Sequence, residues 1–127
     1  MKKSVVCPLF ILCLATASVT MAQDALVQVA RKEGKVVWHT SLALASSTAL
    51  SHYFQNKYKG IEVEVHRNGS QRVLQRFMQE TSAGIRNADI IHTSDAGHFE
   101  LLKDKNLLVK FTPQAVASFP DGFKDKA

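Results

Sequence analysis

The segment Lys35–Thr40 reads KVVWHT, and it decides how the rest of the chain is interpreted. β-Branched and aromatic residues dominate it, which is typical of a strand buried on both faces of a parallel sheet. Gly34 precedes it, at the end of an amphipathic stretch over residues 24–33. This order predicts a short helix, a glycine C-cap and then a central strand.

Helix-type and strand-type segments alternate through the rest of the chain. Further strands are expected at 61–66 (IEVEVH), 88–92 (ADIIH) and, briefly, 107–111; helices are expected at 43–57, 70–83 and 95–105, with Asn106 as a left-handed terminator. The first of these helices is expected to bury one apolar face, formed by Ala45, Ala49, Leu50, Tyr53, Phe54 and Tyr58. Such alternation predicts an α/β fold, with right-handed crossovers and an open, mostly parallel sheet covered by helices on both faces. The strand at 61–66 alternates cleanly, so we expect it nearer the sheet edge.

Three predicted strands each end in a histidine followed by small polar residues. His39, His66 and His92 are 27 and 26 residues apart. The carboxyl ends of parallel strands meet at one edge of a sheet, where ligands bind and helix N-termini offer free N–H groups. The sequence therefore predicts a site for a small polar ligand, formed by Thr40, Ser41, Gly69, Ser70, Thr93, Ser94 and Asp95. Helix capping is the alternative role for Ser70 and Asp95.

The histidines allow a second hypothesis. If His39, His66 and His92 share one face of the sheet, they form a row that can bind zinc and a water molecule, as in a small exported metal-dependent hydrolase. No HExxH spacing and no specific Ser–His–acid arrangement supports this function. Histidines near strand ends are more often hydrogen-bonded to a neighbouring loop. We therefore predict a protein that is not an enzyme, with His39 and His92 as weak metal-ligand candidates.

Residues 1–22 have the three parts of a secretory signal peptide. Lys2 and Lys3 come first, an apolar run fills residues 5–19, and Thr20 and Ala22 are the small residues before the predicted cleavage point. A membrane anchor is the alternative, but a span needs roughly 20 apolar residues. The leader predicts export, and hence a periplasmic location.

Both cysteines, Cys7 and Cys13, lie in this leader. Neither follows the small residue that a lipid-attachment site needs, so a lipoprotein is not expected. The mature chain has no cysteine, which excludes disulfides, thiolate metal sites and cysteine catalysis.

Composition and charge narrow the function classes further. The 105 residues after the leader are enough for one domain, and 46% hydrophobic with 21% charged residues excludes a disordered or fibrous protein. The mature chain carries 14 basic and 11 acidic residues, scattered along its length. Nucleic acid is therefore not expected as a partner, whereas an anionic ligand is compatible with this balance.

Taken together, these residues resemble the N-terminal lobe of bacterial extracellular solute-binding proteins that serve ABC transporters, particularly the iron(III)-type branch. Four stretches carry the resemblance, in the same order as in that family: 33–41 (EGKVVWHTS), 59–63 (KGIEV), Gly69-Ser70 with 73–77 (VLQRF), and 88–95 (ADIIHTSD). The resemblance covers essentially the whole mature chain.

The resemblance implies a type II periplasmic-binding-protein fold, in which two lobes close on a solute. Residues 23–111 would form the first lobe, and residues 112–127 an irregular tail that begins the connection to a second lobe missing from this chain. The solute would be a small polar molecule or Fe³⁺, and the partners an ABC permease and its ATPase in the inner membrane. The protein is expected to be a monomer.

Two departures from the iron-binding pattern stand out. In iron-binding relatives the ligating tyrosine pair comes from the second lobe, whereas Tyr53 and Tyr58 are predicted core residues here. His39 stands where relatives often have a tyrosine. A lone lobe encloses its ligand on one side only, so weak binding is expected; a truncated gene product without a function of its own is the remaining alternative.

Overall fold

The computed structural model describes residues 25–123, so the predicted leader lies outside the described residues. The chain divides into two compact units, the first ending at Ser94 and the second beginning at Asp95. Within the described residues, no helix combines the length and the apolar character that crossing a membrane requires.

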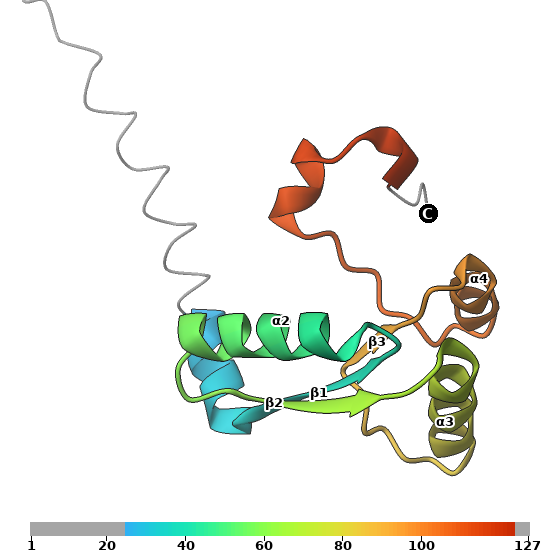
Figure 1. Cartoon of the computed structure of the whole chain (residues 1–127), viewed down its shortest axis with the longest axis horizontal. Coiled ribbons are helices and arrows are strands. Elements are labelled where there is room, and N and C mark those ends of the chain that lie inside the picture. The colour runs from blue at the N-terminus through green and yellow to red at the C-terminus, as the bar shows by residue number, and fades with distance from the viewer. Residues whose placement is uncertain (1–24, 124–127) are drawn as a thin grey trace, which may run out of the picture. The chain divides into compact units, whose positions relative to one another are not determined.

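The first unit has the predicted alternation of helices and parallel strands. A helix over residues 25–33 leads into strand β1, and the remaining elements follow in strict alternation: β1 Lys35–Thr40, α2 Leu44–Lys57, β2 Glu62–Arg67, α3 Ser70–Ser82 and β3 Ile90–His92. All strand pairs are parallel and the order is β2-β1-β3, so β1 is central and β2 lies at an edge. These findings confirm the predicted fold class and the predicted positions of the first two strands (Figure 1).

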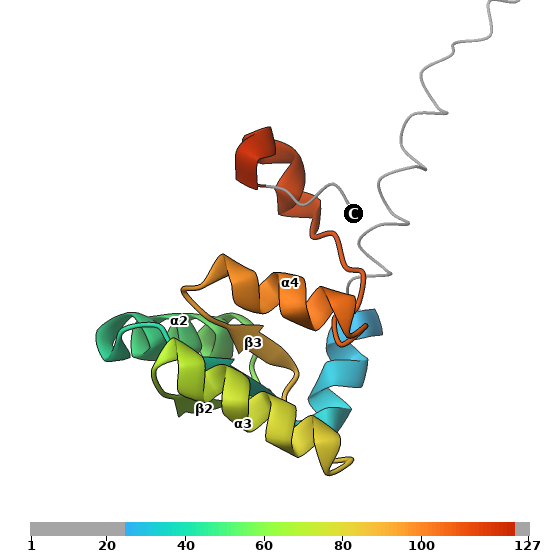
Figure 2. The same cartoon turned by 90° about the vertical axis from the view of Figure 1, so that its right-hand side faces the viewer.

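Strand register assigns each side chain to a face of the sheet. His39 is the partner of His66, whereas Trp38 is the partner of Val65. Side chains alternate along a strand, so His39 and His66 share the face opposite Trp38 and Val65. Helix α3 covers the first face, and α2 lies against the second (Figures 1 and 2).

The apolar core of the first unit is small. Its buried hydrophobic side chains are Val37, Trp38, Ile61, Val73 and Leu74. Gly34 and Gly84 have φ values of 78° and 74°, left-handed conformations that suit glycine at the ends of the first helix and of α3.

The predicted buried face of α2 is wrong. Leu50 and Tyr53 are 51% and 66% exposed, and the residues that α2 buries are Ser47 and Ser51. Both serine hydroxyls are satisfied within the helix, because Ser47 Oγ donates to the Leu44 carbonyl and Ser51 Oγ to the Ser47 carbonyl. Small side chains let the helix approach the sheet closely, which explains why serines take the buried positions.

The second unit contains helix α4 Ala96–Asp104 and two short 3₁₀ helices, Gln114–Ser118 and Asp121–Phe123. Asn106 has a φ of 54°, which confirms the predicted left-handed terminator. The short strand predicted at 107–111 is wrong: Val109 and Phe111 are 90% and 80% exposed, and the described part of this unit offers no strand to pair with. Apolar composition alone does not make a strand without a neighbouring strand to pair with.

Candidate functional site

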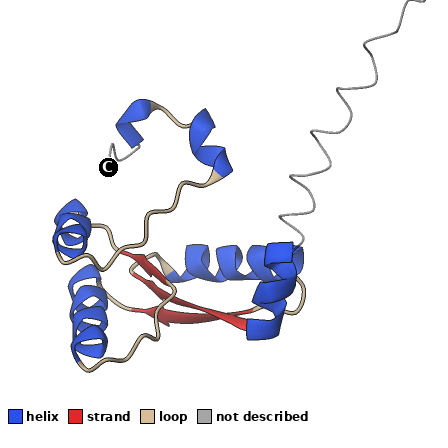
Figure 3. Ribbon diagram, turned by 180° about the vertical axis from the view of Figure 1, so that it is seen from behind, coloured by secondary structure: helices blue, strands red, loops and turns tan. Residues whose placement is uncertain are grey.

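The predicted polar loops of the first unit lie together at the carboxyl edge of the sheet (Figure 3). The backbone N–H of Ser41 donates to the His92 carbonyl at 3.0 Å, and the N–H of Asn68 donates to the Thr40 carbonyl at 3.0 Å. These hydrogen bonds continue the strand ladders one residue beyond the strands. The loops after β1, β2 and β3 therefore begin side by side at the carboxyl edge of the sheet.

Ser70 and Ser94 meet at this edge, although 24 residues separate them. Their Oγ atoms are 2.7 Å apart, and the backbone N–H of Ser94 donates to Ser70 Oγ at 3.0 Å. Ser70 begins α3, whose N-cap Gly69 supplies no side-chain cap. The first N–H groups of α3 are thus left to solvent or a ligand beside two hydroxyls.

Ser41 contributes a hydroxyl of a different kind. Its Oγ is fully buried and has no hydrogen-bond partner among residues 25–123. Buried polar atoms are normally paired, so an orphaned hydroxyl at a loop edge calls for an explanation. A bound ligand that accepts a hydrogen bond from Ser41 Oγ, or donates one to it, is an explanation that fits the position of Ser41 at this edge.

Thr40 and Thr93 lie behind this edge. Both side chains are buried, at 0% and 5% exposure. Thr40 Oγ1 accepts a hydrogen bond from the Leu42 N–H at 3.0 Å and lies 3.1 Å from His92 Nδ1. Thr40 is therefore a positioning residue that holds the first loop against β3.

Gly69 and Asp95 are the N-cap residues of α3 and α4. Gly69 has an ordinary φ of −64°, and a Cβ atom there would meet nothing within 4 Å. Asp95 belongs to the second unit, where its Oδ1 accepts a hydrogen bond from the Gly97 N–H at 2.9 Å and caps α4. This is the capping role considered for Asp95 from the sequence.

The predicted row of three histidines does not form. His92 is the register partner of Thr40, and Ile91 is the partner of His39, so His39 and His92 point to opposite faces of the sheet. Among the described residues, no three His, Cys, Asp or Glu side chains are grouped to hold a metal ion. The hydrolase hypothesis therefore loses the arrangement on which it depended.

A second polar cluster, which the sequence analysis missed, lies on the α3 face. His39 is 1% exposed and neither ring nitrogen has a hydrogen-bond partner in the described chain; its Nε2 lies 3.9 Å from Glu80 Oε2. Its ring meets the His66 ring edge to face, with centroids 5.0 Å apart. Burial lowers the pKa of His39, so the ring is neutral at pH 7.

His66 and α3 complete this cluster. Arg76 donates through its Nη1 to His66 Nδ1 at 3.2 Å and through its Nε to Glu80 at 2.7 Å. Because arginine can only donate, His66 Nδ1 is the acceptor, and His66 Nε2 carries the proton that bonds Glu64 at 2.8 Å. The i,i+4 spacing of Arg76 and Glu80 was visible in the sequence, but their meeting with His39 depends on the crossover.

Comparison with known proteins supports the fold. No family model matches the sequence, and no curated protein matches it significantly. Among solved structures, the chain is similar to iron-bound HitA from Pseudomonas aeruginosa, with a TM-score of 0.57 and 23% identity. The match covers 65% of this chain and 26% of HitA, so the present chain spans about a quarter of that protein.

Proposed function

We propose that this chain forms the N-terminal lobe of a periplasmic solute-binding protein that delivers a small polar solute or ferric iron to an ABC uptake transporter. In this role it is a binding protein and not an enzyme, and its partners are a membrane permease and an ATPase. The solute binds at the carboxyl edge of the sheet, against Ser41, Ser70 and Ser94.

The orphaned hydroxyl of Ser41 is the observation that carries the proposal. It lies at the edge where Ser70 and Ser94 meet 2.7 Å apart and where α3 begins without a side-chain cap. Hydroxyls and free N–H groups of this kind can replace part of the hydration shell of a polar solute. The fold shared with iron-bound HitA and the family resemblance of four sequence stretches support the same role.

The experiment is a binding screen by ¹⁵N NMR on the chain without residues 1–22. The probes are ferric nitrilotriacetate, 2-aminoethylphosphonate, spermidine, thiamine and glucose. One probe is expected to change the amide signals of Ser41, Ser70 and Ser94 in a saturable way, by shifting them or, for paramagnetic Fe³⁺, by broadening them. Weak affinity is expected, because a single lobe leaves one side of the ligand in water.

Two variants sharpen this screen. Ser94→Ala removes one of the paired hydroxyls and is expected to weaken binding of the successful probe. Ser46→Ala removes an exposed hydroxyl on α2 and should leave binding unchanged. Shifts confined to other regions, or equal binding by both variants, would contradict the proposed site.

A further inference from the structure

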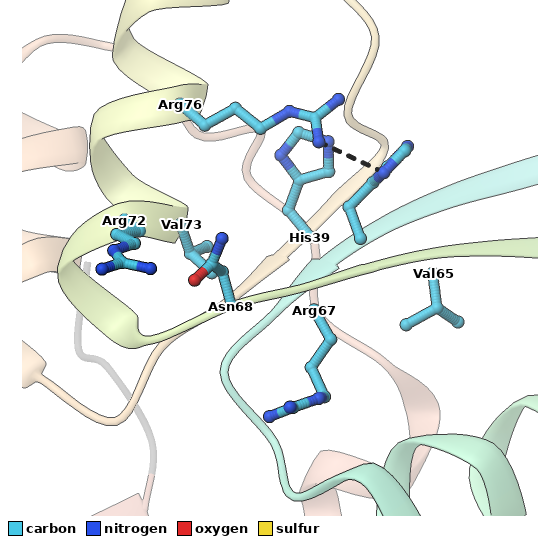
Figure 4. A pocket seen from close by; sticks show the side chains of 8 residues that line it. His39, Val65, Arg67, Asn68, Arg72, Val73 and Arg76 are labelled. Atoms are coloured by element: carbon cyan, nitrogen blue, oxygen red, sulfur yellow. Dashed lines mark hydrogen bonds between the residues drawn. The ribbon is translucent and has the colours of Figure 1, made fainter.

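A basic pocket lies beside α3, apart from the serine edge. It has a volume of about 260 Å³ and is lined by His39, Val65, His66, Arg67, Asn68, Arg72, Val73 and Arg76 (Figure 4). Three arginines and no carboxylate line it, and Ser41, Ser70 and Ser94 do not take part. Its size suits a small ligand, since pockets for drug-sized molecules start at about 300 Å³.

Arg72 and Arg76 supply the charge from successive turns of α3. Arg72 forms no ion pair with any other residue in 25–123. Arg76 uses its Nε for Glu80 and its Nη1 for His66, so further N–H donors of its guanidinium remain for a ligand. Figure 4 shows Arg76 and His39 on the same side of β2.

The open edge of β2 adds backbone donors. The N–H groups of Glu62 and Asn68 bond to the chain beside β2, at the Gly34 and Thr40 carbonyls. In a parallel strand this pattern alternates, so the N–H groups of Val65 and Arg67 point away from β1. The side chains of these two residues lie on the other side of β2 in Figure 4, so their main-chain atoms line the pocket.

His39 is a buried residue of the pocket lining. Its ring is 1% exposed, and both ring nitrogens are without a hydrogen bond in the described chain. A neutral histidine carries one N–H donor, and this donor has no hydrogen-bond acceptor among the described residues. An acceptor atom lying in the plane of the ring, beside the protonated nitrogen, would use that donor.

We propose that this pocket binds a phosphate group, either as inorganic phosphate or on a small phosphate ester. Guanidinium groups match phosphate oxygens in geometry, and the β2 edge and His39 add neutral donors from other directions. Of the nearby carboxylates, Glu64 bonds Lys35 and His66, and Glu80 bonds Arg76 through its Oε1. Glu80 Oε2 lies 3.9 Å from His39 Nε2 and has no hydrogen-bond partner among residues 25–123. This site is independent of the solute site proposed above.

The test is a ¹⁵N NMR titration that follows backbone amides and arginine Nε–H groups of the chain without residues 1–22. Sodium phosphate and glycerol 3-phosphate are each added against sodium chloride of equal ionic strength. Saturable shifts are expected at Arg72 and Arg76 Nε–H and at the amides of Val65 and Arg67. Stronger binding of the ester identifies it as the source of the phosphate, and equal or weaker binding identifies inorganic phosphate.

Arg72→Gln should weaken phosphate binding at least about tenfold, since a charge-assisted hydrogen bond is worth at least that factor. Arg86→Gln removes the same charge from an exposed loop and serves as the matched control. Shifts that chloride reproduces, or equal weakening in both variants, would overturn the proposal. Shifts at Ser41, Ser70 and Ser94 alone would overturn it while favouring the serine edge as the phosphate site.

Discussion

The two faces of the small sheet are built in opposite ways. The face toward α2 carries Trp38 and Thr40, and the helix meets it with the buried serines Ser47 and Ser51. The face toward α3 carries Val37 and His39; α3 buries Val73 and Leu74, and its Glu80 Oε2 lies 3.9 Å from His39 Nε2. The difference teaches that close packing of small side chains governs the first face, whereas the second face combines apolar packing with a buried titratable ring, and each prediction below tests one side of that contrast.

The largest effect is expected at Trp38. Its side chain is 7% exposed on the α2 face, so Trp38→Ala should lower the free energy of unfolding by about 3–5 kcal/mol. Tyr53→Ala is the matched control, because Tyr53 is 66% exposed and should change stability by at most about 0.5 kcal/mol. Urea unfolding followed by tryptophan fluorescence, or by circular dichroism for the Trp38 variant, measures both. Equal losses would restore the originally predicted packing of α2.

The next effect tests the close approach of α2. Ser47 is 1% exposed, so Ser47→Leu overfills the space beneath the helix and should cost about 1–3 kcal/mol. Ser46→Leu places the same side chain one residue earlier, at an exposed position, and should have little effect on stability. Thermal unfolding by circular dichroism compares the two. A neutral Ser47→Leu variant would show that the helix can move away from the sheet at no cost.

Much of this architecture is encoded in local patterns. The bounds of β1, the parallel alternation and the Asn106 terminator follow from periodicity and turn chemistry, which act over a few residues. The buried face of α2 does not, because its Ala, Leu and Tyr residues repeat at helical spacing as regularly as its serines. Only the fit against the sheet decides which face turns inward.

The candidate site was partly predictable for the same reason. Strand alternation implies that the loops after β1, β2 and β3 share an edge, so the meeting of Ser70 and Ser94 could be anticipated. The register of the strand pairs could not be anticipated from the sequence, because a shift of one residue in β3 moves the His92 side chain to the other face of the sheet. The cluster of His39 with Glu80 also depends on how α3 crosses the sheet.

The pH dependence of stability tests the α3 face. Burial lowers the pKa of His39, with Glu80 acting against this effect and Arg76 and His66 adding to it. Near pH 6.5 the His39 side chain therefore binds a proton in the unfolded chain but not in the folded chain. The free energy of unfolding should fall as the pH drops below about 6.5. One such group contributes a slope of at most about 1.4 kcal/mol per pH unit.

His39→Phe removes this titration and should flatten the stability profile between pH 7 and pH 5. His52→Phe, at an exposed position of α2, should keep the wild-type slope. Urea unfolding at each pH measures the difference. An unchanged slope in His39→Phe would mean that His39 of the wild-type protein is protonated as easily in the folded as in the unfolded chain. Water or Glu80 would then stabilise the charged His39 ring on the α3 face.

The smallest effect separates a binding hydroxyl from a structural one at the sheet edge. Ser41→Ala deletes a buried hydroxyl without a partner in the described chain, so stability should stay constant or rise by up to about 1 kcal/mol. Thr40→Val deletes a hydroxyl that bonds the Leu42 N–H and should lower stability by about 1 kcal/mol. Urea unfolding measures the stability of both variants. An NMR titration with the probe that shifts the Ser41 amide then measures their binding. A residue kept for its ligand is expected to lose binding without losing stability, and a loss of stability in Ser41→Ala as large as that in Thr40→Val would assign Ser41 to the fold instead.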